Sequence, residues 1–269
     1  MLDKDFKFKK KFGQNFILDK NFLRSIVNDF DLRENSNVLE IGAGAGTLTE
    51  VLAQTYKKVL SVEIDKTLTE HLIELKNNYS NLDFIFDDIL KVDIKTIEEY
   101  FDNNNYVIIA NLPYYITSQI IFKFLYDSTH LDEMYIMVQK EVGSRFCSKS
   151  GSKEYGIPSV VISTIGSANI VKNVGRKNFY PVPEVDSCIL NIKIDREKRD
   201  AVDIKSFSQF VQKCFMMRRK TLMNNLVKQN NDKQKCEYAF AKLKLEQNVR
   251  PEQITPEQYV DLYKLISGV

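Results

Sequence analysis

An amide, a proline and two aromatic rings stand together in the stretch NLPYY, residues 111–115, directly after the apolar run YVIIA. An amide side chain and a main-chain carbonyl can both accept hydrogen bonds from an exocyclic amine. A proline fixes the backbone that carries them, and a tyrosine ring offers a flat face for stacking. The stretch predicts a clamp that holds a base by its amino group. The alternative is a proline-terminated strand with two tyrosines in the core.

The chemistry that such a clamp would serve is transfer to an adenine amine, which is a poor nucleophile because its lone pair is delocalised into the ring. Acceptors at the Asn111 side chain and the Leu112 carbonyl would hold the amine hydrogens and favour a pyramidal nitrogen aimed at the electrophile. Tyr114 is predicted to stack on the base, and Phe179, in the segment NFYPVPEVDS, to cover its other face. A base reaches such a pocket only after leaving its stack.

A glycine-rich turn, EIGAGAG at residues 40–46, precedes a helix-like stretch that begins at Thr47. Glycines let the backbone turn sharply and approach a ligand closely. A dinucleotide fingerprint G-x-G-x-x-G that starts at Gly42 would need its third glycine at Thr47, so that match fails. An acidic residue, Glu40, before a G-x-G-x-G run is typical of S-adenosylmethionine-dependent methyltransferases instead.

Two further carboxylates follow the next strand-like runs. Glu63 lies 21 residues after Gly42, where a carboxylate can accept hydrogen bonds from both hydroxyls of a ribose. Asp88 follows the run LDFIF and is positioned to accept a hydrogen bond from an adenine amine, although taken alone it would be an ordinary turn residue. Glycine or acidic features at three consecutive strand ends make coincidence less likely and together favour a nucleoside cofactor.

These residues need a scaffold that brings the ends of several strands to one edge. Short runs rich in Val, Ile and Leu alternate with helical stretches, which indicates strands buried on both faces of a parallel sheet. The pattern predicts an α/β fold with a doubly wound, Rossmann-like sheet that binds ligands at the carboxyl ends of its strands. Strands are predicted at 37–42, 58–65, 82–86, 106–111, 133–139 and 185–194, and helices at 47–56 and 66–79, while 160–166 fits a helix or a strand.

The composition changes after about residue 195. The segment REKRD, 196–200, reads as a charged linker. Apolar residues at helical spacing follow it, with Ser206 and Gln209 as a plausible capping box, and no strand signal comes after them. We therefore predict a catalytic domain over 1–195 and a small all-α domain over 196–269.

The net charge of +2 conceals an uneven distribution of charge. Residues 21–132 carry 9 lysines and arginines against 18 acidic residues, whereas residues 1–20 carry 6 against 3 and residues 193–250 carry 15 against 7. Basic flanks around an acidic middle can bind a polyanion, although lysines on solvated helix faces would give the same counts.

Several classes of protein are disfavoured by the sequence. No apolar stretch approaches the roughly 20 residues that span a bilayer, and no apolar segment follows the basic N-terminal residues, so we expect neither a membrane span nor a secretory signal. Four dispersed cysteines and two histidines predict reduced thiols and no metal site. We expect a cytoplasmic monomer.

The ordered set of motifs resembles the KsgA-type small-subunit ribosomal RNA adenine dimethyltransferases almost from end to end. Elements of that family stand here as KKFGQNFILD (10–19), EIGAGAGTLTE (40–50), VEID (62–65), NLPYYITS (111–118), MVQKEV (137–142), GSKEYG (151–156), FYPVPEVDS (179–187), RRKTLMNNL (218–226) and RPEQITPEQY (250–259). Single motifs recur in other methyltransferases, but the last three in this order are specific. Two departures are Gln119, which replaces a common proline, and Ile157-Pro158 in a segment that is usually helical.

The resemblance implies transfer of two methyl groups from S-adenosylmethionine to each of two adjacent adenosines in a hairpin loop near the 3′ end of 16S rRNA, in the small ribosomal subunit or its precursor. The family's cofactor contacts fall on Asn15, Ile17, Gly42, Glu63, Asp88 and Asn111. Tyr114 and Phe179 would enclose the target base beside Asn111. The helical domain would contact RNA through Arg218, Arg219 and Lys220, and such phosphate contacts would make binding depend on salt.

Three other functions are open at this stage. The related family that methylates an adenosine of the large-subunit rRNA and confers macrolide resistance shares the glycine loop and the clamp, but GSKEYG, FYPVPEVDS and RRKTLMNNL favour the small subunit. A non-catalytic nucleic-acid-binding factor of this fold is disfavoured because Asn111, Glu63 and Asp88 are intact, although an added role in ribosome assembly stays open. A nicotinamide dehydrogenase fails on the glycine spacing.

Overall fold

The computed structural model describes residues 16–113, 115–229 and 232–268. The chain divides into two compact units, one formed by Met1–Gly143 with Ile170–Asn191 and the other by Ser144–Asn169 with Ile192–Val269. The helical unit thus takes in a segment far upstream of the predicted boundary at 195, because the helix within that segment packs against the C-terminal helices.

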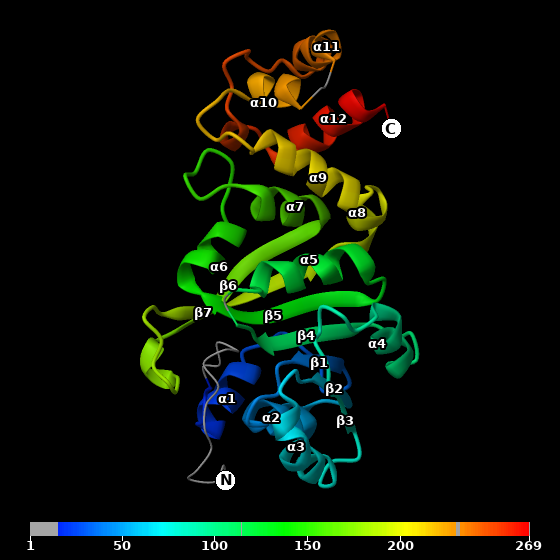
Figure 1. The fold of residues 1–269 in the computed structure, drawn as a ribbon, viewed down its shortest axis with the longest axis vertical. Helices are drawn as coiled ribbons and strands as arrows, with labels where there is room; N and C mark the ends of the chain where they lie inside the picture. Colours follow the sequence, from blue (N-terminus) through cyan, green and yellow to red (C-terminus); the bar gives the residue numbers. More distant parts are fainter. Residues whose placement is uncertain (1–15, 114, 230–231, 269) are drawn as a thin grey trace. The chain divides into compact units, whose positions relative to one another are not determined.

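A seven-stranded sheet has the strand order β3-β2-β1-β4-β5-β7-β6 (Figure 1). The pairs β1–β2, β1–β4, β2–β3 and β4–β5 are parallel, and four of the five residues in each of β1 and β2 are buried. Such strands need helices on both faces, so the predicted α/β fold is confirmed. The strands are β1 Asn37–Ile41, β2 Lys58–Val62, β3 Leu82–Ile85, β4 Tyr106–Asn111, β5 Leu131–Gln139, β6 Gly166–Val174 and β7 Ser187–Ile194.

The strand order reverses between β1 and β4, and this point positions the site. Ile41 pairs in register with Val62 on one side and with Ala110 on the other, so β1, β2 and β4 end level with one another. Loops that leave the carboxyl ends of strands at such a switch point diverge and open a crevice for ligands. The glycine loop after β1 and the clamp after β4 therefore face each other across it.

Helices complete the first unit, and aspartate side chains cap two of them. Asp19 accepts hydrogen bonds from two amides at the start of α1, and Asp93 does the same for one amide of α4. The helices are α1 Lys20–Val27, α2 Thr47–Thr55, α3 Thr69–Lys76 after the 3₁₀ turn η2 Lys66–Leu68, α4 Ile94–Tyr100, α5 Thr117–Asp127, α6 Lys140–Phe146 and the 3₁₀ turn η3 Arg176–Asn178. Helix α6 extends into the second unit.

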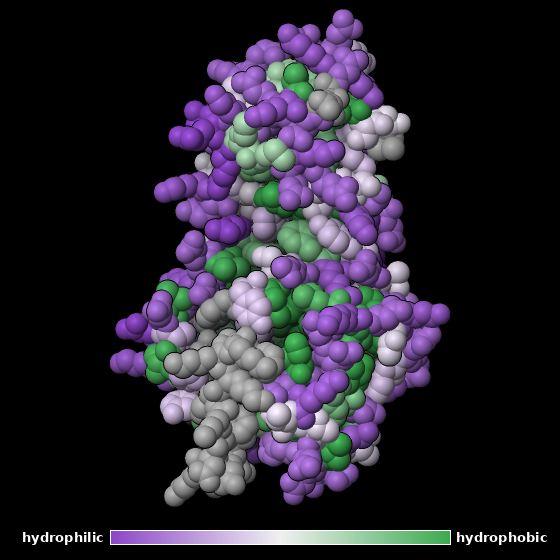
Figure 2. Space-filling model, viewed as in Figure 1, coloured by the Kyte–Doolittle hydropathy of each residue, from purple (hydrophilic) through white to green (hydrophobic). Residues whose placement is uncertain are grey.

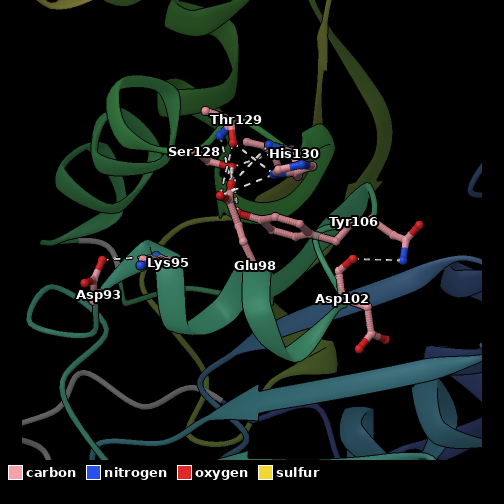
Figure 3. A network of polar contacts seen from close by, with 10 residues as sticks. Asp93, Lys95, Glu98, Asp102, Tyr106, Ser128, Thr129 and His130 are labelled. Carbon is pink, nitrogen blue, oxygen red and sulfur yellow. Dashed lines mark hydrogen bonds and ion pairs between the residues drawn. The ribbon is translucent and has the colours of Figure 1, made fainter.

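A polar network joins α4 to the connection between α5 and β5 (Figure 3). Glu98 Oε1 accepts hydrogen bonds from the Ser128 hydroxyl at 2.8 Å, the Thr129 amide at 2.8 Å and the His130 amide at 3.1 Å. The Ser128 hydroxyl also lies 2.8 Å from that of buried Tyr106. Burial alone would raise the pKa of Glu98, but these hydrogen bonds outweigh it and lower that pKa.

Glu98→Ala is expected to lower the free energy of unfolding by about 3 kcal/mol, because it leaves several inward donors without an acceptor. Since the pKa of Glu98 is lowered by folding, its stabilisation is lost as the pH falls below the ordinary value of 4.5, so the two proteins should converge in acid. Urea unfolding at pH 7 and pH 4 measures both effects. Glu99→Ala is the control, since Glu99 is exposed on the same helix; equal losses in both variants would contradict the network's role.

The second unit consists mainly of helices around its own core, which includes Val160, Phe207, Cys214, Phe240 and Tyr259. Helix α7 packs against α9 and α12 within it. The elements are α7 Ile157–Ile165, α8 Arg196–Asp200, α9 Ile204–Cys214, α10 Leu222–Lys228, α11 Lys233–Leu243, the 3₁₀ turn η4 Pro251–Gln253 and α12 Pro256–Ser267.

Two local predictions are corrected here, and one that was left open between helix and strand is resolved. The segment 196–200 is not a linker but the short helix α8, which the Asp195 side chain caps. The cap of α9 is Asp203, whose carboxylate accepts from the amides of Lys205 and Ser206, so Ser206 lies inside the helix. The ambiguous stretch 160–166 is helical up to Ile165, and Pro158 does not prevent this because it lies in the first turn of the helix, where proline is tolerated.

Candidate active site

The glycine loop after β1 passes close to the end of β4. Gly42 has a φ of 86°, and a Cβ placed on it would lie 3.9 Å from the main-chain oxygen of Asn111. Gly44 has a φ of 53°, and a Cβ there would overlap the ring of Phe16. Side chains at either position would strain the backbone or displace a neighbour. The loop therefore needs glycine at both positions for its positive φ, and at Gly44 also for its close contact with Phe16.

Glu63 stands directly behind this loop. It is 3% exposed, its Oε2 accepts the Gly44 amide at 2.8 Å, and its Oε1 accepts the Asp65 amide at 2.7 Å. Burial raises the pKa of this carboxyl despite the two hydrogen bonds. The Ile64 amide also stabilises the charged carboxylate. Carboxylate oxygens can each accept more than one hydrogen bond, so a carboxylate fixed in this way suits hydroxyl donors such as those of a ribose.

Glu40, near the end of β1, connects the strand that precedes the loop to α2 and β2. Its Oε2 accepts hydrogen bonds from the Thr49 hydroxyl on α2 and the Ser61 hydroxyl on β2, each at 2.6 Å. The side chain is fully buried and its Oε1 has no hydrogen-bond partner. Burial raises the pKa of Glu40 to about 7. Glu40 thus links β1 to α2 and β2, and its raised pKa keeps it mainly protonated below about pH 7.

Glu40→Gln is expected to gain stability relative to the original chain as the pH rises from about 4.5 to about 7. Folding raises the pKa of Glu40, so the native state binds a proton that the unfolded state releases, and this contribution declines across the window. The relative gain is about 3 kcal/mol at most, from about 1.4 kcal/mol per pKa unit. Urea unfolding at pH 5 and pH 7.5 measures it, with the exposed Glu70→Gln as control. Parallel stability curves would contradict the raised pKa.

Two pockets adjoin Gly42 on either side. One is a narrow pocket of about 50 Å³, and Ile17, Ala43 and Asn111 are among its lining residues. The other has a similar volume of about 60 Å³, and its lining includes Asp88 and Pro113. Asp88 Oδ1 already accepts the Leu90 amide at 3.0 Å and keeps further acceptor capacity. Gly42 is common to both pockets: Ile17 and Asn111 line one of them and Asp88 lines the other, while Glu63 is bonded to the same glycine loop. The structure thus gathers these five residues around the turn after β1.

The structure describes only some of the other predicted contacts of this site. Asn111 ends β4 and is half-buried. Asn15 and Tyr114 lie outside the residues that the structure describes. Phe16 was missed by sequence reasoning, although its ring packs on Gly44 and lines the same pocket as Ile17 and Asn111. An aromatic residue next to Asn15 in the motif KKFGQNFILD was the available signal.

Comparison with known proteins identifies the family to which the chain belongs. The model of the family described as "Ribosomal RNA adenine dimethylase" matches residues 5–267. The chain belongs to this family. It is 42% identical over 258 residues to "Ribosomal RNA small subunit methyltransferase A" of Caldanaerobacter subterraneus, with 95% of this chain and 96% of the relative covered. It is 38% identical over 261 residues to the protein of the same name from Mycoplasma capricolum, covering 97% and 98%.

Solved structures agree on the fold of this rRNA adenine dimethylase. A dimethyladenosine transferase from Plasmodium falciparum superposes with a TM-score of 0.80 at 22% identity, covering 94% of this chain and 98% of that one. The 23S rRNA methyltransferase ErmE gives 0.68 at 24% identity, covering 94% and 100%. Both chains share the fold, and membership of the family makes S-adenosylmethionine the methyl donor of this enzyme.

Phe179 of the dimethylase lies in the core rather than in an open pocket. It is 3% exposed, and it shares a cluster of buried residues with Ile17 and Ile109. The next residue, Tyr180, is bridged to Phe16 by two main-chain hydrogen bonds of 2.9 and 2.8 Å. Stacking of a target base on Phe179 therefore requires one face of the ring to become uncovered.

The predicted RNA contacts of the dimethylase lie in the second unit, between α9 and α10. Arg218, Arg219 and Lys220 are all exposed there. Arg218 nevertheless donates hydrogen bonds from Nη2 to the carbonyls of Lys153 at 2.7 Å and Tyr155 at 3.1 Å.

Among the residues that the structure describes, no helix is long and apolar enough to span a bilayer, and no cluster of three or more His, Cys, Asp or Glu is arranged for a metal ion.

Proposed function

We propose that this enzyme dimethylates the N6 amines of two adjacent adenosines in the hairpin loop near the 3′ end of 16S rRNA, on the small ribosomal subunit or its precursor in the cytoplasm. The observation that carries the proposal is the approach of the end of β4 to the glycine loop: the main-chain carbonyl oxygen of Asn111 lies 3.9 Å from the position of a Cβ on Gly42. Cofactor and acceptor amine would thus meet at the ends of β1 and β4.

Each residue of the crevice has a separate part in this proposal. Glu63 would hold the ribose of the cofactor, and Asp88 its adenine amine. Bound S-adenosylmethionine supplies an electrophilic methyl group. Asn111 and the Leu112 carbonyl would accept the two hydrogens of the target amine in the first transfer, and one of them the remaining hydrogen in the second, and so direct the lone pair of N6 at that methyl group. The pyramidal nitrogen needs no strongly basic partner, because its proton can leave to water once the methyl group is attached.

The choice of small subunit is supported by the small-subunit methyltransferases at 38% and 42% identity, each matched over nearly its whole length. Label transfer tests it directly: the purified protein is incubated with radiolabelled S-adenosylmethionine and with unmethylated small or large ribosomal subunits. We expect label in the small subunit, approaching four methyl groups per particle. Label confined to the large subunit would overturn the proposal.

We also propose that the protein acts as a monomer without a metal ion.

A further inference from the structure

The three adjacent basic residues of the helical unit do not have equivalent surroundings. Arg218 donates to two main-chain carbonyls of the segment GSKEYG, as described above. Arg219 and Lys220 are exposed, and neither forms a hydrogen bond through its side chain or an ion pair with any residue that the structure describes. Hydrogen bonds from a charged guanidinium to a carbonyl are stronger than those between neutral groups. Arg218 is therefore engaged within the protein, whereas its two neighbours are available to a ligand.

The segment that Arg218 holds, residues 151–156, is also fixed at both of its ends. The Gly151 amide donates to the Glu252 carbonyl at 2.7 Å. Tyr155 is fully buried, and its ring packs edge-on against Phe215 with the centroids 6.3 Å apart. Arg218 bonds the segment between these two anchors. A loop held at three points is preorganised, which lowers the entropy cost of binding a ligand to it.

The residue at the middle anchor is itself basic. The Lys153 carbonyl accepts from Arg218, so the backbone of Lys153 lies beside the segment 218–220 although 65 residues separate them in sequence. Figure 1 shows the connection from α6 to α7 next to the connection from α9 to α10. Lys153 is exposed and has no ion pair with a described residue, and exposed Glu154 follows it. The face of the helical unit that Figure 2 shows is mostly hydrophilic.

We propose that Arg218 is a positioning residue, which holds the loop 151–156 so that Lys153 joins Arg219 and Lys220 in one surface for RNA phosphates. This rests on the proposed function, which supplies the RNA. Lysines and arginines without acidic partners attract phosphates, and each contact releases bound counterions. Glu154 opposes this attraction and keeps the surface from being uniformly basic.

The first test examines the loop without RNA. Amides of residues 151–155 should exchange with deuterium at least tenfold faster in Arg218→Ala than in the original chain, because the central anchor is lost. Arg219→Ala removes the same charge from the neighbouring residue and should leave this exchange unchanged. Equal exchange in Arg218→Ala and the original chain would overturn the positioning role.

The second test measures the affinity for unmethylated small subunits between 50 and 200 mM salt. Lys153→Ala is expected to weaken binding about fivefold and to reduce the slope of log affinity against log salt by about 0.7 to 0.9, as one lost phosphate contact would. Glu154→Gln should strengthen binding about twofold. A Lys153→Ala protein with the original affinity and slope would refute the shared surface.

A double-mutant cycle separates positioning from direct contact. If Arg218 acts through Lys153, the protein with both Arg218→Ala and Lys153→Ala binds no more weakly than Arg218→Ala alone, whereas the losses from Arg219→Ala and Lys153→Ala multiply. Losses that multiply in both pairs would overturn the proposal. If the original chain binds no small subunits, the proposed function and the phosphate ligand both fail, while deuterium exchange still decides whether Arg218 anchors the loop.

Discussion

Replacing Asn111 with alanine is expected to lower kcat for methyl transfer about 10³-fold, while the affinity for small subunits stays within about twofold. Alanine removes the amide acceptor at the end of β4 and leaves the backbone of the strand in place. Without that acceptor one hydrogen of the target amine is no longer held, and the lone pair of N6 is no longer directed at the methyl group. Single-turnover transfer of labelled methyl groups, with cofactor and subunits saturating, measures the effect on the chemical step.

The matched control for this substitution is Asn105→Ala. Asn105 is exposed and precedes the first residue of the same strand, so the change removes an identical side chain at the opposite end of β4. Its kcat should be that of the original enzyme. Unchanged turnover in Asn111→Ala would sink the clamp mechanism. A rise in KM for the subunit with kcat preserved would instead assign Asn111 to binding that is equal in ground state and transition state.

The strands that the sequence predicts are those that contain a clear run of apolar residues. Each strand predicted from a near-continuous apolar run is present, with ends shifted by a few residues. Strand β6, Gly166–Val174, was missed because its residues are mostly exposed or half-buried and give no apolar run. Helix α8 was missed because all five of its residues are charged and none is buried, so only the cap at Asp195 marks it.

The predicted site divides in a similar way. Gly42, Glu63 and Asp88 could be found because each follows a strand, and parallel strands end at a common edge. Contacts between distant segments left no pattern to read. The two hydroxyls that donate to Glu40 belong to Thr49 on α2 and Ser61 on β2. The carbonyls that accept from Arg218 lie more than 60 residues upstream of it. Such pairings follow from tertiary packing, which local spacing does not encode.

Replacing Glu63 with alanine is expected to raise the Kd for S-adenosylmethionine about 100-fold, or about 3 kcal/mol. The change removes the acceptor for the ribose hydroxyls, and it also leaves the Gly44 and Asp65 amides without the carboxylate that now orients them. Glu63→Gln keeps one oxygen acceptor and should lose less. Isothermal titration calorimetry measures each Kd, and the exposed Glu70→Ala on α3 is the control, with an unchanged Kd.

Binding of the demethylated cofactor, S-adenosylhomocysteine, distinguishes a ribose contact of Glu63 from a purely electrostatic role. S-adenosylhomocysteine has the same ribose but lacks the positive sulfonium, so a carboxylate that binds the hydroxyls contributes equally to both ligands. A carboxylate that acts mainly on the sulfonium contributes to S-adenosylmethionine alone. We expect Glu63→Ala to weaken both ligands by the same factor within about threefold. Undiminished affinity for both would refute the ribose contact, and a loss confined to S-adenosylmethionine would reassign Glu63 to the sulfonium charge.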